Sequence, residues 1–401
     1  MNHTCDVIIA GGGPAGATAA CCLQRGGKRV LVLEKEKLPR YKACGGGLSQ
    51  TFLAEVFPFS FDDVIDARVD TISYEYNNGV QSTVPCRPDV MAMVMRDKFD
   101  AYLLQQSGAE VQTGCRVTDV RETPDGVTVE FADGARLTAD YLIGADGANS
   151  IVRRKAGLHQ KQVLIGAIEA EVPFSNELRA GYGNTPLFIF DRPRSGYSWV
   201  FPKTDHLSVG IGALGHVRDL REHLERIMQG HGISLAGIPL HGHSIPVYNP
   251  AARLNTARII LAGDAAGLAD PFSGEGIRPA IRSGQIAAEA ILNDTVKAYT
   301  ARIRATLGKY NLYSLLLWKV FNPLRDICLA LGAPNPFTSD AILDLLSGRQ
   351  SSLDVAVKSF VTLWTKFLPI EISAAFIELF QGENAKQIFY RKKYPGRKSV
   401  D

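Results

Sequence analysis

A glycine-rich segment near the amino terminus has the clearest chemical potential in this sequence: Gly11-Gly12-Gly13-Pro14-Ala15-Gly16. A hydrophobic run over residues 7 to 10 precedes it, and a helix rich in small residues is expected to follow. Gly11 permits a sharp turn, Gly13 lets the backbone approach a pyrophosphate, and Gly16 lets the helix pack against the strand. Because a helix N-terminus attracts phosphate, the segment predicts a dinucleotide site. The alternative is a turn with a purely structural role.

A carboxylate ends the next hydrophobic run, at Glu34. At the end of a second strand, such a side chain would accept hydrogen bonds from ribose hydroxyls and would repel a 2′-phosphate. The order strand, glycine turn, helix, strand and acid therefore favours FAD or NAD over NADP.

Two further aspartates follow hydrophobic runs, Asp146 before Gly147 and Asp264 after Gly263. Asp146 is expected at the carboxyl edge of a parallel sheet, where open α/β folds bind ligands. Asp264 would hydrogen-bond a ribityl or ribose hydroxyl, or would simply cap a helix. A long alanine-rich helix is expected to begin near Gly276 and Ile277, where its amides and positive dipole end would stabilise the anionic side of a reduced flavin.

Three consecutive glycines, residues 45 to 47, follow Cys44. Such a run costs backbone entropy, so it indicates either a place where the chain lies against something flat, such as a flavin, or a flexible surface loop. A second unusual run is Tyr197-Ser198-Trp199-Val200-Phe201, whose strand period places its three aromatic rings on one face. These rings would form either ordinary core or the wall of an apolar pocket.

The composition describes an ordinary globular protein of two or three domains, with 401 residues, 46% hydrophobic and 21% charged. A net charge of +3 is too small to suggest nucleic acid as the main partner. The locally basic end, residues 390 to 398, is either a solvated tail or a contact for an anionic membrane surface.

The seven cysteines form no Cys-x-x-Cys pair, and no signal peptide is recognisable, so we expect a cytoplasmic protein. No apolar run reaches the roughly 18 residues that span a bilayer, which leaves peripheral membrane contact open. His241 and His243 have no carboxylate or cysteine at ligand spacing, so we interpret them as loop residues and expect no metal site.

The element pattern predicts an α/β protein, α+β overall, with a Rossmann-like dinucleotide-binding domain and an inserted, mostly antiparallel β domain. We expect a hairpin over residues 69–86 around Asn77-Asn78-Gly79, a helix over 89–107, a further helix near 216–229, and a helical carboxyl-terminal region. In that last region, residues 315–321, 342–346, 353–368 and 370–380 are predicted to be amphipathic helices, which would either cap an apolar tunnel or pack on the second domain. We expect three domains. The dinucleotide-binding domain comprises residues 1–68, 88–161 and 255–296, the β domain comprises 69–87 and 162–254, and the helical region comprises 297–401.

The glycine turn with Glu34, Ala145-Asp146-Gly147 with Arg153, and Gly263-Asp264 together resemble the three fingerprints of the FAD flavoproteins that include para-hydroxybenzoate hydroxylase. Two further motifs, Lys42-Ala43-Cys44-Gly45-Gly46-Gly47 and Tyr197-x-Trp199-x-Phe201-Pro202, look like signatures of the geranylgeranyl reductase family. The resemblance covers roughly residues 1 to 295.

This resemblance implies FAD as cofactor and a set of residues around it. The expected FAD-binding residues are Gly11, Gly13, Ala15, Gly16, Glu34, Cys44, Gly45, Gly47, Arg96, Val117, Asp146, Asp264, Gly276 and Ile277. The motif associated with a polyprenyl pocket falls on Tyr197 and Trp199, with Phe201 on the same face. Since no second glycine fingerprint is visible, the electron donor would bind transiently, as NADPH or as a reduced ferredoxin protein.

The expected activity is the FAD-dependent saturation of isolated C=C bonds in a polyprenyl chain on a lipid, quinone or pigment precursor. The hydride would come from the reduced flavin, and the proton from either Cys44 or bound water. Two alternatives stay open: an FAD-dependent aromatic or polyketide monooxygenase, and a flavin-bearing prenyl-lipid or quinone carrier without turnover.

Overall fold

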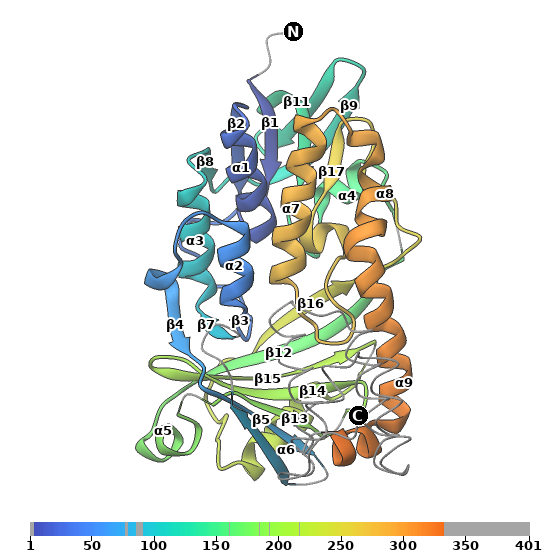
Figure 1. Cartoon of the computed structure of the whole chain (residues 1–401). Helices are drawn as coiled ribbons and strands as arrows, with labels where there is room; N and C mark the ends of the chain where they lie inside the picture. Colours follow the sequence, from blue (N-terminus) through green and yellow to red (C-terminus); the bar gives the residue numbers. More distant parts are fainter. Residues whose placement is uncertain are drawn as a thin grey trace, which may run out of the picture.

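The computed structural model describes residues 4–332, apart from residues 77–78, 86–90, 160, 184, 192 and 216. Two large β-sheets lie one above the other in Figure 1, and helices α1, α3 and α7 cover the upper sheet. This arrangement of a Rossmann-like unit, a second sheet and a helical end confirms the predicted fold class. The division into three domains stays a prediction.

The upper sheet has a parallel centre in the order β8-β2-β1-β11, with β17 also paired to β11. These strands are β1 (Cys5–Ala10), β2 (Val30–Glu34), β8 (Glu110–Thr113), β11 (Arg136–Gly144) and β17 (Ile259–Leu261). Strands β9 (Val117–Thr123) and β10 (Gly126–Phe131) continue the sheet in antiparallel fashion. Because β1, β11 and β17 are parallel, the turns that follow them meet at one edge.

Small residues let two helices of the upper layer approach closely, α1 (Pro14–Arg25) and α7 (Ile277–Leu292). A Cβ added at Gly284 of α7 would lie 2.3 Å from the carbonyl oxygen of Ala15. Likewise, a Cβ at Gly16 would lie 2.0 Å from the carbonyl oxygen of Gly11. The small side chains therefore fix α1 between the glycine turn and α7.

The lower sheet is mostly antiparallel, as predicted, with one parallel pair between β5 and β13. Its order is β16-β12-β15-β14-β13-β5-β6, with β5 (Thr71–Tyr76), β6 (Val80–Pro85), β12 (Val163–Pro173), β13 (Leu187–Phe190), β14 (Gly196–Pro202), β15 (His206–Leu214) and β16 (His241–Val247). The predicted hairpin is confirmed by the antiparallel pairing of β5 with β6. The side chains of β14 alternate between the two faces of the sheet. Val200 packs in the aliphatic core against α6 (Leu220–Gly230), while Trp199 and Phe201 belong to an aromatic cluster on the other face.

A three-stranded sheet joins the two layers and corrects one predicted helix. It comprises β3 (Gly47–Leu48), β4 (Ile65–Arg68) and β7 (Ala92–Val94), beside helix α2 (Gln50–Val56). The helix predicted over 89–107 is wrong in its first part, because Ala92–Val94 pairs as a buried strand and α3 (Arg96–Gln106) begins only afterwards. The start of the helix predicted near 216 was also wrong, since Asp219 takes a left-handed conformation, with φ of 61°, immediately before α6.

The carboxyl-terminal helices run along one side of both layers, shown in orange in Figure 1. After α8 (Tyr299–Ile303) and a π-helical turn over residues 304–308, α9 (Lys309–Gly332) contains the segment 315–321 that was predicted to be helical. The segments predicted over 342–346, 353–368 and 370–380 lie outside the described residues. Among the described helices, none is both long and apolar enough to cross a membrane.

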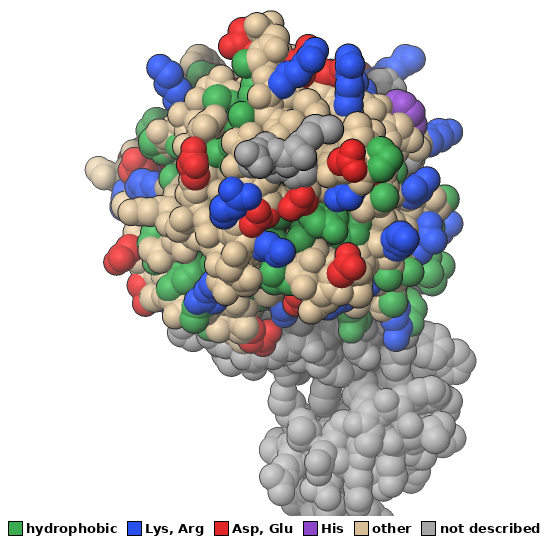
Figure 2. Space-filling model, turned by 90° about the horizontal axis from the view of Figure 1, so that it is seen from above, with side chains coloured by type: hydrophobic (Ala, Val, Ile, Leu, Met, Phe, Trp, Pro, Cys, Tyr) green, Lys and Arg blue, Asp and Glu red, His purple; other side chains and the backbone are tan. Residues whose placement is uncertain are grey.

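The face of the molecule in Figure 2 carries side chains of both charges. Lysine and arginine side chains alternate there with aspartate and glutamate side chains over the described part of the chain. Hydrophobic side chains are scattered between them on the same face.

Candidate cofactor and substrate site

A cavity of about 1840 Å³ lies between the carboxyl edge of the upper sheet and the aromatic face of the lower sheet. Gly11, Asp146 and Asp264 line it from the upper sheet, and Tyr197 and Trp199 line it from the lower sheet. Small-molecule pockets usually measure roughly 300–1,000 Å³, so this cavity has room for a cofactor and a second molecule.

The structure brings the residues predicted for cofactor and substrate together around this cavity, with one exception. Those that line it are Gly11, Gly13, Ala15, Glu34, Cys44, Gly45, Gly47, Arg96, Val117, Asp146, Asp264, Gly276, Ile277, Tyr197, Trp199 and Phe201. The exception is Gly16, whose close contact with the Gly11 carbonyl serves helix packing. The assignment of these residues to FAD stays a prediction.

The glycine turn and Glu34 position one another. Gly11 has a φ of 109°, and a Cβ there would lie 2.2 Å from the carbonyl oxygen of Ala145, so glycine is required for both reasons. The backbone N–H of Gly12 donates to Oε2 of Glu34 over 2.8 Å, and the N–H of Glu36 donates to Oε1 over 3.1 Å. The buried carboxylate is therefore fixed at the cavity edge.

Arg40 offers a cationic group beside the glycine turn that sequence reasoning missed. One of its terminal nitrogens, NH2, donates to Asp100 over 3.0 Å and would lie 3.6 Å from a Cβ at Gly13. The other, NH1, is buried without a hydrogen-bond partner among the described residues. A buried, unpaired guanidinium nitrogen in a cavity next to a glycine turn fits an anionic phosphate group, so this end of the cavity suits the diphosphate of FAD.

Arg96 lies fully inside the protein and forms a bidentate pair with Asp100. Its Nε and NH2 atoms each donate over 2.8 Å to one carboxylate oxygen. Although burial opposes the charge, Asp100 and Cys44 raise the pKa of Arg96 above its usual value. Arg96 is thus a permanent cation in the cavity wall.

The side chain of Asp146 is engaged in capping a helix. Its carboxylate accepts hydrogen bonds from Ser150 Oγ and the Ile151 N–H, each over 2.6 Å, at the start of α4 (Ile151–Lys155). Arg153 donates from NH1 to the carbonyl of Ala265 over 3.1 Å, which ties this turn to the turn after β17. The carboxylate of Asp146 therefore stabilises the turn that lines the cavity.

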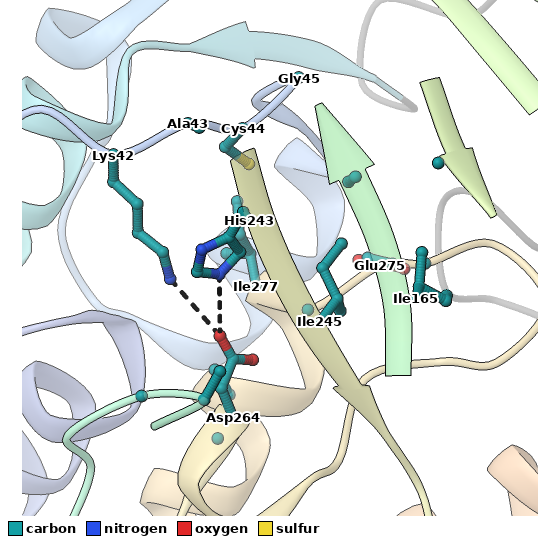
Figure 3. Close-up of a pocket in the computed structure, with 18 of the residues that line it drawn as sticks. Lys42, Ala43, Cys44, Gly45, Ile165, His243, Ile245, Asp264, Glu275 and Ile277 are labelled. Atoms are coloured by element: carbon teal, nitrogen blue, oxygen red, sulfur yellow. Dashed lines mark hydrogen bonds and ion pairs between the residues drawn. The ribbon is translucent and has the colours of Figure 1, made fainter. Parts of the chain in front are cut away.

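Asp264 lies largely buried between two basic side chains that point toward it in Figure 3. Lys42 Nζ is 3.5 Å and His243 Nε2 is 3.8 Å from its Oδ2. Burial alone would raise the pKa of Asp264, but Lys42, His243 and Arg96 outweigh burial and lower it well below its usual range. Asp264 is therefore an ionised acceptor facing the cavity.

The interpretation of His241 and His243 as loop residues was wrong. Both lie in β16, which pairs with β12, and the ring of His243 faces Asp264. The alternation of His241, His243, Ile245 and Val247 is the signal that could have identified this strand.

Gly45 and Gly46 have neighbours that exclude a side chain, whereas the nearest atom at Gly47 is the flexible end of Met91. A Cβ at Gly45 would lie 2.9 Å from Cδ2 of Phe201, and one at Gly47 would lie 2.4 Å from Cε of Met91. Gly46 has a φ of 71°, and its Cβ would lie 2.2 Å from the carbonyl oxygen of Val94. This packing rules against the alternative of a flexible surface loop.

Two buried ionisable residues hold the same segment from the lower sheet, and sequence reasoning missed both. Glu169 of β12 accepts a hydrogen bond from the N–H of Cys44 over 2.6 Å. Lys203, which follows β14, donates to the carbonyl of Gly45 over 2.7 Å and to that of Val94 over 3.1 Å. Burial raises the pKa of Glu169 and lowers that of Lys203.

The aromatic residues of β14 serve both as core and as cavity wall. Tyr197 and Trp199 satisfy their polar atoms within the protein: the hydroxyl donates to the carbonyl of Ser273 over 2.7 Å, and the indole N–H donates to Ser208 Oγ over 3.3 Å. Their ring faces, together with Phe201, give this end of the cavity an apolar surface.

Comparison with known proteins supports an FAD-binding site and a family of reductases. Residues 4–181 match the family model described as an FAD binding domain. The chain is 31% identical over 330 residues to a chloroplastic geranylgeranyl diphosphate reductase of Nicotiana tabacum, covering 76% of this chain and 69% of the relative. It is 30% identical over 378 residues to digeranylgeranylglycerophospholipid reductase 2 of Methanothermobacter thermautotrophicus, covering 86% and 93%.

Solved structures share the fold at lower identity. A geranylgeranyl bacteriochlorophyll reductase-like protein of Thermoplasma acidophilum superposes with a TM-score of 0.72 at 23% identity, covering 96% of this chain and 99% of the other. A flavin-dependent brominase reaches 0.70 at 19% identity, covering 91% and 100%. These likenesses show the fold alone.

The fold, the cavity and the family model define an FAD-dependent oxidoreductase. Given the identity and coverage of its relatives, the chain belongs to the geranylgeranyl reductase family.

Proposed function

We propose that this protein saturates isolated C=C bonds in a polyprenyl chain carried by a lipid, quinone or pigment precursor. One observation carries the proposal: the glycine turn and the aromatic face of β14 line one continuous cavity. A cofactor held at the first would lie beside an apolar chain held at the second. The names of the two reductase relatives support a prenyl substrate.

In this proposal the chain holds FAD with the residues that line the cofactor end of the cavity. Gly11 and Gly13 give the diphosphate access to the backbone, Arg40 pairs with its charge, and Glu34 accepts from the ribose. Asp264 accepts from the ribityl chain, while Gly276 and Ile277 offer amides at the start of α7. When bound, FAD supplies the hydride chemistry, and the protein supplies orientation.

The aromatic end binds the prenyl chain and keeps water away from the reacting carbon atoms. Each buried methylene contributes about 0.8 kcal/mol, so a few isoprene units provide ample binding without polar contacts. Tyr197 and Trp199 suit this role because their polar atoms are already paired with protein partners, and Phe201 suits it because its ring has no polar atom. Peripheral contact with a membrane, and NADPH or reduced ferredoxin as electron donor, remain part of the proposal.

Anaerobic turnover with chemically reduced FAD tests this function without requiring the natural donor. We expect geranylgeranyl diphosphate or a geranylgeranylated lipid to gain two hydrogens per reduced double bond, measured by mass spectrometry. A requirement for oxygen, with a product heavier by one oxygen atom, would identify a monooxygenase instead. Tight prenyl-lipid binding without any mass shift in the substrates tested would identify a carrier.

A further inference from the structure

Glu169 is a buried acid on the cavity wall whose role the fold alone does not explain. Its side chain is only 4% exposed, yet it lines the cavity beside Cys44 and Trp199. Its two oxygens accept hydrogen bonds over 2.6 Å each, from the Cys44 N–H and from Ser208 Oγ. No ion pair joins Glu169 to a cation among the described residues.

Four other carboxyl groups of the cavity wall have different surroundings. Asp264 faces Lys42 and His243, Glu34 is held by the Gly12 N–H, and Glu275 forms an ion pair with Arg278. Asp146 caps α4. Burial raises the pKa of Glu275 as it does that of Glu169. Glu275 is nevertheless ion-paired with Arg278, whereas among the described residues no cation forms an ion pair with Glu169.

We propose that Glu169 is the internal acid of this site and supplies the proton that completes saturation of the alkene. The inference rests on the proposed function. One alkene carbon receives the hydride, which carries two electrons from FAD reduced by the external donor. The neighbouring carbon receives the proton as the O–H bond of Glu169 breaks and a C–H bond forms. The carboxylate that remains regains its proton from water.

The surroundings of Glu169 suit both states that this role requires. Burial raises its pKa, which favours the protonated carboxyl group before reaction. The two hydrogen-bond donors are already in place for the carboxylate, and the positive charge of Lys203 also favours that anion. An acid that holds its proton and yet forms a stabilised anion is what general acid catalysis near neutral pH needs.

Lys203 acts as a positioning residue in this proposal. Its ammonium group holds the carbonyls of Gly45 and Val94, which keeps the segment 44–47 against β7. That segment carries the N–H of Cys44 that binds Glu169. The ionisable groups that face Glu169 are Lys203, Glu171 on the same strand, Cys44 and Tyr41 on the facing loop, and His241 as its register partner on β16.

Two variants of Glu169 and two comparison variants test the proposal. Glu169→Gln keeps the size of the side chain and one acceptor oxygen, and its NH2 group can donate to Ser208 Oγ, but it cannot give up a carboxyl proton. Glu169→Asp retains an acid. Glu222→Gln is the control, because Glu222 lies in the first turn of α6 and outside the cavity lining. Cys44→Ser tests the thiol as the competing proton donor.

Infrared spectroscopy of the FAD-loaded protein gives a readout that does not depend on turnover. At neutral pH we expect a carbonyl band of a protonated carboxyl to be lost in Glu169→Gln and to persist in Glu222→Gln. Unchanged FAD content, measured by absorbance, checks that the variant folds and holds its cofactor. A band that is the same in Glu169→Gln as in the unmodified protein, or loss of FAD from this variant, overturns the proposal.

Single-turnover reduction of a geranylgeranyl substrate by pre-reduced protein gives the second readout. We expect Glu169→Gln to lower the rate about a hundredfold or more, and Glu169→Asp to restore part of it. The rate of the unmodified protein should fall as pH rises and Glu169 loses its proton, and this decline should be missing in Glu169→Gln.

The possible failures of this experiment are distinguishable. If the unmodified protein reduces no prenyl alkene, the proposed function fails and the role of Glu169 fails with it. If the unmodified protein turns over and Glu169→Gln matches it in rate and pH profile, this inference alone is wrong. A hundredfold loss in Cys44→Ser with none in Glu169→Gln would assign the proton to the thiol.

Discussion

At the residue scale, the surroundings shift the pKa values of two carboxyl groups of one cavity in opposite directions. Asp264 lies beside Lys42 and His243, which lower its pKa in spite of burial. Glu169 is also buried but has no such pair in the described part of the chain, and burial raises its pKa. Opposite shifts in one site commonly mark different chemical roles, here a fixed anion and a proton donor.

Replacement of Asp264 by alanine should empty the FAD site. The change removes the acceptor proposed for the ribityl chain and leaves Lys42 and His243 without their shared anion. We expect colourless purified protein, measured as FAD absorbance per chain, whereas Asp205→Ala should keep its FAD because Asp205 is 84% exposed. A yellow Asp264→Ala protein with full occupancy would contradict the assignment.

The same variant should also change the acid stability of the protein. Because the pKa of Asp264 is lowered on folding, its ionised form adds stability above the ordinary carboxyl pKa of about 4, and that stability is lost as pH falls further. The difference in unfolding free energy between the unmodified protein and Asp264→Ala should therefore narrow below about pH 4.

At the scale of elements, the segment 44–47 is held by contacts from the lower sheet and from β7 of the three-stranded sheet. Phe201 of β14 covers Gly45, the carbonyl of Val94 in β7 covers Gly46, and Glu169 of β12 binds the N–H of Cys44. The position of this segment in the cavity wall therefore depends on the lower sheet. Its glycines are required by this close approach rather than by mobility.

Gly46→Ala should destabilise the protein more than the same change at Gly27. Both glycines have positive φ, 71° and 77°, so both variants lose about 1 kcal/mol for backbone conformation. Only at Gly46 would the added Cβ meet an atom within 4 Å, the Val94 carbonyl oxygen at 2.2 Å being nearest. We expect an additional loss of about 1–3 kcal/mol, measured by urea unfolding. Equal losses of unfolding free energy in the two variants would show that the segment shifts to accept the added Cβ at little cost.

At the scale of the whole molecule, the cavity exists because two sheets and a late helix meet. The upper sheet contributes a polar edge, the lower sheet contributes an aromatic face, and α9 adds Phe321 at the apolar end. The ring of Phe321 lies 5.4 Å from that of Phe272 and 6.3 Å from that of Phe190, measured between centroids. Polar and apolar ends are thus supplied by separate parts of the chain.

Phe321→Ala should weaken binding of a long prenyl substrate more than it slows the chemical step. Loss of one ring from the apolar wall removes about 1.5 kcal/mol or more of burial, which corresponds to a KM about tenfold higher. Tyr310→Ala is the matched control, because Tyr310 lies on the same helix, is 53% exposed and does not line the cavity. Similar KM values for the two variants would place the prenyl chain elsewhere.

The sequence by itself determined the parts of this protein that depend on local pattern. The glycine turn, Glu34, the hairpin of β5 and β6, and the alternating rings of β14 are all set by neighbours close along the chain. These patterns also carried the family resemblance that the relatives support.

Tertiary structure decided what depends on neighbours far away in sequence. Glu169 and Lys203 approach Cys44 and Gly45 across more than a hundred residues, with sequence separations of 125 and 158. No local periodicity encodes such a contact, and His243 gained its partner Asp264 only once β16 paired with β12. Burial and charge pairing set protonation states, and both arise only when the chain has folded.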